Sequence, residues 1–161
     1  MLQGSILLLE RVTNGFRRRL NYFYFKATLK NVGTQTYFDS GVRIYGKQFV
    51  HIGSEVNVNS GVTIQSCGAA PVTIGDRVVL SYDCMILTGG LDRGHCFESR
   101  EHLVKPVIIE DGVWLGARSV VLPGITIGKN SLIAAGSVVT KDVSDHTLVA
   151  GVPAKPIKIF K

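Results

Sequence analysis

The sequence predicts an all-β fold, a parallel β-helix with a triangular cross-section, and two observations lead to this prediction. First, residues 109–144 divide into six consecutive hexads, each of which opens with an aliphatic residue. A period of six matches neither the stripe of an amphipathic helix nor the alternation of a simple strand; it is typical of solenoids whose repeats each form a short strand and a corner. Second, the same period recurs upstream, in hexads that open at Ile52 and at Ile74. The heads of the six consecutive hexads are Ile109, Leu115, Val121, Ile127, Ile133 and Val139.

Each coil of the predicted prism consists of three hexads, and the aliphatic heads point inward and stack on those of the neighbouring coils. Adjacent coils are then about 4.8 Å apart, which is the spacing between strands of one sheet. Small residues at the second place of a hexad, such as Gly116, Gly128 and Ala134, suit sharp corners where a larger side chain would clash. About fourteen hexads are recognisable, beginning near Phe38 and Ile44, which predicts four to five coils.

The N-terminal segment, residues 1–37, differs from the repeat domain that we expect over residues 38–161. Apolar residues at helical spacing predict an amphipathic helix over about residues 5–20. Such a helix could cap the prism, because the open end of a repeat array needs a cover. The alternative is that the cations at 17–19 and the aromatic residues after them contact an anionic membrane surface, and both roles are compatible. The apolar positions are Leu9, Val12, Phe16, Leu20 and Phe23.

Residues 88–106 interrupt the repeat and contain no hexad. Three glycines, two histidines and six charged residues occur there. In an array this regular, a long insertion usually forms a functional loop on one face. The sequence therefore predicts one excursion loop that carries His95 and His102 and takes part in function.

The amino-acid composition limits the kinds of binding partner and the cellular compartment that we expect for this protein. The formal net charge of +6 favours an anionic partner, but no stripe of cations interleaved with aromatic residues supports nucleic-acid binding. The three cysteines, an odd number without metal-like spacing, are predicted to be free thiols in a reducing compartment. We expect no signal peptide, because the apolar run at residues 7–9 is short and ends at Glu10. A cytoplasmic location follows, with the inner face of the membrane as a possible place of contact.

Three stretches carry a family resemblance: VWLGARSVVLPGITIG, AAGSVVTKDV and VAGVPAKPIK. They resemble the hexapeptide-repeat acyltransferases, and most of all the galactoside, maltose and capsule-polysaccharide O-acetyltransferases. The resemblance covers about residues 38–159 and is most specific over 105–158. It implies that the β-helix is left-handed, which the period alone does not predict. It also implies a homotrimer with acetyl-CoA bound in the cleft between neighbouring prisms.

The same resemblance implies roles for individual residues. Trp114 matches a tryptophan that recurs beside the site, and Asn59 matches an asparagine that contacts the acceptor sugar. The acidic residue expected eight places later is Cys67 here, which leaves the identity of the acceptor open. Six positions match residues that contact CoA, through backbone groups, polar side chains or cations that meet its phosphates: Ala117, Ala135, Thr140, Lys141, Lys155 and Lys158.

The general base implied by the resemblance is a histidine on the excursion loop. His95 follows a glycine in that loop and is the preferred residue, and His102 is the competitor. A neutral imidazole can accept the proton of a hydroxyl as that oxygen attacks the thioester. We expect a backbone N–H at Gly116 or Ala117 to donate to the oxyanion that forms.

The sequence thus predicts an O-acetyltransferase that uses acetyl-CoA, without a metal, to modify a hydroxyl of a sugar or polysaccharide precursor. One rival is a zinc enzyme similar to the gamma-class carbonic anhydrases, but three converging histidines are needed for that site, and only two of the four here are close in sequence. The other rival is a non-catalytic scaffold. The lysines at 141, 155 and 158 argue against it, because a scaffold has no need of a phosphate-binding corner.

Overall fold

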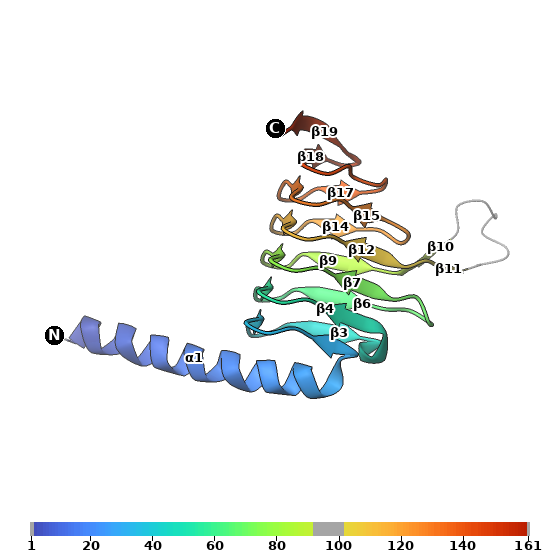
Figure 1. Ribbon diagram of the computed structural model, residues 1–161. Helices are drawn as coiled ribbons and strands as arrows, with labels where there is room; N and C mark the ends of the chain where they lie inside the picture. The colour runs from blue at the N-terminus through green and yellow to red at the C-terminus, as the bar shows by residue number, and fades with distance from the viewer. Residues whose placement is uncertain (1, 92–101, 161) are drawn as a thin grey trace.

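The computed structural model describes residues 2–91 and 102–160, and within the first helix the side chains of residue 13 and of residues 15 onward. One long helix, α1 (Leu2–Thr28), precedes a stack of short strands wound into a three-sided prism (Figure 1). Nearly all neighbouring strands in the three sheets run parallel, as the repeat predicts. In the described part of the chain, no helix is both long enough and apolar enough to span a bilayer.

The three sheets form the faces of the prism, and the chain visits them in the order A, B, C. Sheet A contains β1 (Asn31–Val32), β4 (Val50–Ile52), β7 (Val72–Ile74), β12 (Val107–Ile109) and β15 (Thr126–Ile127). Sheet B contains β2 (Tyr37–Phe38), β5 (Asn57–Val58), β8 (Val79–Leu80), β13 (Trp114–Leu115), β16 (Leu132–Ile133), β18 (Thr147–Gly151) and the antiparallel β19 (Ala154–Ile159). Sheet C contains β3 (Arg43–Tyr45), β6 (Thr63–Gln65), β9 (Met85–Leu87), β14 (Val120–Val121) and β17 (Val138–Val139).

The core is the column of hexad heads that the sequence predicts. Ile109 pairs in register with Ile127, 18 positions further along the chain, and Leu115 pairs with Ile133 in the same way. The heads are buried because they fill the inside of the prism, where each contributes about 1.5–3 kcal/mol of hydrophobic stabilisation. This packing confirms the predicted prism. The fully buried heads include Ile52, Ile64, Ile74, Leu80, Ile86, Ile109, Leu115, Ile127 and Ile133.

Coils of unequal length differ at a single edge of the prism, the one between sheets C and A. The 3-10 helix η1 (Lys47–Phe49), the turn at 66–71 and the antiparallel hairpin of β10 (Gly89–Leu91) and β11 (His102–Val104) all occur there. In Figure 1 the hairpin projects sideways from the stack. Because all extra residues lie at this one edge, the strands of the three faces still pair in register from coil to coil.

The helix α1 is longer than the predicted 5–20, and coiling begins at Asn31, before Phe38, because Val32 pairs with Ile52 and takes the place of a hexad head. Phe25 is buried against Phe38, with ring centroids 4.5 Å apart. This C-terminal part of the helix covers the open end of the core.

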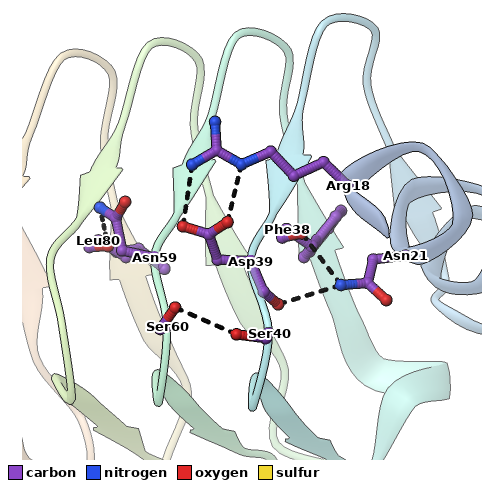
Figure 2. A network of polar contacts seen from close by, with 8 residues as sticks. All are labelled: Arg18, Asn21, Phe38, Asp39, Ser40, Asn59, Ser60 and Leu80. Carbon is purple, nitrogen blue, oxygen red and sulfur yellow. Dashed lines mark hydrogen bonds and ion pairs between the residues drawn. The ribbon is translucent and has the colours of Figure 1, made fainter. Parts of the chain in front are cut away.

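Polar contacts hold the helix on the first coil. The Arg18 guanidinium forms two hydrogen bonds with the carboxylate of Asp39, at 2.7 and 3.0 Å, and Asn21 donates to the carbonyl oxygens of Phe38 and Asp39 (Figure 2). The hydrogen bond from Arg18 to Asp39 raises the pKa of the guanidinium.

The reason predicted for glycine at the second hexad place needs correction. Gly116 does not have a positive φ; instead, a Cβ on it would lie 2.5 Å from the backbone nitrogen of Ala135 in the next coil. Gly128 is restricted in the same way by Asp145. The close approach of the neighbouring coil, rather than the sharpness of the corner, therefore excludes a side chain at these two positions.

Candidate functional site

The C-terminal end of the prism contains a cavity of about 350 Å³ that brings together three of the predicted CoA-binding residues. Thr140 and Lys141 follow β17 at the edge between sheets C and A, and Lys155 reaches the cavity because β19 folds back antiparallel on β18, opposite Ala150. Lys141 and Lys155 are exposed. Asp142 also lines the cavity, and its carboxylate accepts from the N–H of Thr126 at 2.8 Å. The two cations outweigh this one anion, so the cavity suits an anionic group such as a phosphate.

Lys158 does not line this cavity. It lies on β19 opposite Leu148, and its Nζ is 5.6 Å from the centroid of the Phe160 ring, within the range of a cation–π contact. The structure therefore separates Lys158 from Lys141 and Lys155, although all three side chains are exposed.

Ala117 and Ala135 occupy the edge between sheets B and C. They follow β13 and β16 in adjacent coils, and the backbone N–H of Gly136 donates to the carbonyl oxygen of Ala117 at 2.8 Å. The N–H of Gly116 donates to the carbonyl of Ile133 at 2.8 Å. Among the backbone hydrogen bonds of the described residues, none is donated by the N–H of Ala117. Of the two predicted oxyanion donors, only Ala117 therefore has an N–H that is not used in coil stacking.

Asn59 lies lower on the same edge, after β5. Its side-chain amide donates to the carbonyl oxygen of Leu80 at 2.9 Å, as Figure 2 shows. This hydrogen bond ties two coils together and turns the amide nitrogen into the stack. The side-chain oxygen of Asn59 is left as the group that could contact a ligand.

Trp114 lies on the outer face of sheet B, with 53% of its surface exposed. Its indole Nε1 donates to the hydroxyl of Ser81 at 2.9 Å. Sequence reasoning did not select Ser81, because the two residues are 33 positions apart and meet only through the stacking of β8 on β13. The hydrogen bond to Ser81 fixes the orientation of the indole. The signal that predicts this contact is the pairing of the hexad heads Leu80 and Leu115, because Ser81 follows Leu80 and Trp114 precedes Leu115.

Of the two candidate histidines, the structure describes His102. His102 is exposed on β11, where it pairs with Leu91 of β10. His95, the preferred base, lies outside the described residues. The base of the hairpin is ordered by two hydrogen bonds of Thr88: its hydroxyl accepts from the N–H of Cys67 at 2.7 Å, and its carbonyl accepts from the N–H of Lys105 at 2.9 Å.

The predicted site residues therefore occupy two different edges of sheet C. Asn59, Ala117 and Ala135 lie on the edge shared with sheet B, whereas the hairpin and the cavity of Lys141 lie on the edge shared with sheet A. One chain does not bring these groups together. Leaving residues 92–101 aside, no three His, Cys, Asp or Glu side chains cluster closely enough to hold a metal ion.

Comparison with known proteins identifies the family. A hexapeptide-repeat acetyltransferase from Vibrio cholerae, solved in complex with acetyl coenzyme A, is 31% identical and superposes with a TM-score of 0.81, over 87% of this chain and 76% of that protein. The chain belongs to the hexapeptide-repeat acyltransferases. The repeat itself matches the model of the hexapeptide repeat of succinyl-transferase over residues 106–141. The predicted family and β-helix fold are thus confirmed.

Two curated relatives of this hexapeptide-repeat acyltransferase are named galactoside O-acetyltransferase. The protein from Escherichia coli K12 is 33% identical over 134 residues, which is 83% of this chain and 65% of the relative. The protein from Lactococcus lactis is 36% identical over 110 residues, covering 68% of this chain and 52% of the relative. The chain thus spans between half and two thirds of the length of these relatives.

Proposed function

We propose that this chain transfers an acetyl group from acetyl-CoA to a hydroxyl of a sugar. The observation that carries the proposal is the likeness, at 31% identity, to a structure that holds acetyl coenzyme A. The names of the galactoside O-acetyltransferases support a sugar acceptor. The cavity lined by Thr140, Lys141 and Lys155 supports the binding of a donor that carries phosphates.

In this proposal the donor is held by charge and by backbone groups. Lys141 and Lys155 attract the phosphates, and Lys158 adds to the positive potential at the same end of the prism. Lysine is a point charge without the fork geometry of arginine, so these contacts hold the phosphates without fixing a bidentate orientation. Backbone groups of Ala117 and Ala135 meet the CoA arm.

The transfer then needs a base and an oxyanion donor. His95 accepts the proton of the sugar hydroxyl while the oxygen attacks the thioester carbon, with His102 as the alternative base. The N–H of Ala117 donates to the oxyanion of the tetrahedral intermediate. When that intermediate collapses, the carbon–sulfur bond breaks and the sulfur takes the proton that the histidine accepted. CoA thus leaves as the thiol, and no acyl-enzyme forms.

A trimer is part of the proposal, because the predicted groups lie on both edges of sheet C. A neighbouring prism that packs against this face would supply one set of groups while the first prism supplies the other. The outer face of sheet C supports such packing: Met85, Val120 and Val138 form an apolar row across three coils. Covering this row would remove it from water.

The test is a panel of sugars and nucleotide sugars incubated with acetyl-CoA, with release of the CoA thiol as the readout. We expect His95→Ala to lower kcat by roughly 100-fold or more while leaving the KM for acetyl-CoA nearly unchanged. His102→Ala is the matched control and should retain activity. Lys155→Ala should raise the KM for acetyl-CoA, and less so at high salt, because salt screens the contact.

Two outcomes would contradict the proposal. If acetyl-CoA releases no thiol with any acceptor and does not raise the melting temperature of the protein, the scaffold function is correct, since a ligand that binds only the native state must stabilise it. If His102→Ala abolishes turnover and His95→Ala does not, the base is His102 and the assignment of His95 is wrong.

A further inference from the structure

The face of α1 that points away from the prism is apolar. Arg18, Asn21 and Phe25 contact the first coil, whereas Phe16, Leu20 and Phe23 follow one another at helical spacing on the other side. These three side chains are 65%, 55% and 65% exposed. A stripe of this kind on a helix normally packs against another apolar surface.

Cations flank this stripe, and anions are missing from it. Residues 11–30 contain six arginines and lysines and no aspartate or glutamate. Arg17 and Arg19 are exposed and, at 100° per residue, lie on opposite sides of the stripe. Arg18 differs from both because Asp39 neutralises it. The free surface of α1 thus combines aromatic and aliphatic side chains with uncompensated positive charge.

The position of the helix leaves this surface open to a flat partner. The burial of Phe25 and Leu29 places the prism-facing side of α1 over the end of the core. Phe16 and Leu20 therefore face away from the coils, whereas Phe23, at the border of the stripe, also lines a cavity with Thr36 and Tyr37 of the first coil. Figure 1 shows α1 at one end of the stack, running across that end and beyond it rather than along the coils. A planar surface can therefore meet the stripe while the prism stands clear of it.

We propose that α1 binds an anionic lipid surface, with the helix lying in the plane of the headgroups and Phe16, Leu20 and Phe23 inserted among the acyl chains. An apolar stripe bordered by arginines is the pattern of interfacial helices. A second copy of the helix fits less well as the occupant, because two such stripes facing each other would bring Arg17 and Arg19 of both copies together. Charge complementarity favours anionic lipid.

Vesicle flotation with the full chain tests this proposal. The vesicles are phosphatidylcholine alone or equimolar phosphatidylcholine and phosphatidylglycerol. We expect the wild type to float with the anionic vesicles and much less with the neutral ones. The double variant Arg17→Glu/Arg19→Glu should bind the anionic vesicles at least roughly tenfold more weakly, because each cation near such a surface contributes several-fold in affinity. Arg18 stays in place so that the ion pair with Asp39 is kept.

The control is Arg77→Glu/Lys129→Glu, which makes the same charge change at exposed positions of the prism and should leave binding intact. It also removes the exposed ion pair of Lys129 with Asp111, which contributes little to stability. A second variant, Phe16→Ser/Phe23→Ser, should also lose binding although its charge is unchanged. Equal flotation of the wild type and the Arg17/Arg19 variant would overturn the proposal. So would a lower oligomeric mass of the Phe16/Phe23 variant in sedimentation without lipid, since the stripe would then be a contact between copies.

Discussion

Three small buried side chains at the edge between sheets B and C differ in whether their polar atoms have a hydrogen-bond partner. Cys84, Ser119 and Ser137 occupy equivalent places in successive coils, each just before a strand of sheet C, and all three are buried. Burial raises the pKa of the Cys84 thiol to about 12, so it stays protonated and packs as a small apolar residue. Among the described residues, the Ser119 hydroxyl has no hydrogen-bond partner, whereas that of Ser137 accepts from the N–H of Gly151 at 3.1 Å.

This difference predicts opposite effects of two identical substitutions. Ser119→Ala should raise the free energy of unfolding by about 1 kcal/mol, because it removes a buried hydroxyl that nothing compensates. Ser137→Ala should lower it by a similar amount, since the N–H of Gly151 loses its partner. Denaturant titrations of both variants measure the two changes. Equal effects of the two substitutions would mean that the Ser119 hydroxyl is satisfied in solution.

At the scale of the element, the stacking of one coil on the next determines which side chains fit at a corner between two strands. The hexad pattern predicts the strand positions and the inward-facing heads correctly. It does so because each head pairs in register with the heads of the neighbouring coils and is buried there. It did not predict that Gly116 is required by the next coil, since that contact joins residues of different repeats. The hexad pattern does not predict the hydrogen bond between Trp114 and Ser81 either, because these residues also belong to different repeats. In addition, the excursion loop lengthens the spacing in sequence between their two coils.

Gly116 gives the second prediction. Gly116→Ala should lower the free energy of unfolding by about 1–3 kcal/mol, the usual range for inserting a methyl group into a packed site. The control is Gly15→Ala in α1, where a Cβ would meet nothing within 4 Å; there the change should favour the helix by roughly 0.5–1 kcal/mol. Thermal unfolding followed by circular dichroism compares the two. A neutral Gly116→Ala variant would show that the coils can move apart at this corner.

For the whole molecule, the sequence predicts the prism, its approximate number of coils and the place of its insertion. The left-handed winding and the proposed trimer do not follow from the period, because the period sets how the aliphatic heads stack but neither the hand of the coil nor the number of chains. The predicted site residues lie on two edges of sheet C, and this division depends on which face of the prism each strand occupies. The position of the base stays a prediction, because His95 lies outside the described residues.

The proposed trimer leads to the third prediction. Val120→Glu places a charge in the apolar row on sheet C and should convert the trimer to a species with the mass of one chain, with loss of acetyl transfer. Thr73→Glu, at an exposed position of sheet A, should leave both mass and activity unchanged. Sedimentation velocity measures the mass. Trimers of unaltered mass in the Val120 variant would place the contact between chains on another face.

The edge between sheets C and A tolerates coils of different length, and this tolerance has a practical consequence. A segment can be exchanged there without moving the register of any ladder, so the rod and its projecting hairpin are separable modules. Chimaeras that graft a hairpin of different length between Thr88 and Lys105 should keep the melting temperature of the parent. Under the proposed function, replacing this one loop would alter acceptor preference, while the cavity of Lys141 and Lys155 would be left untouched.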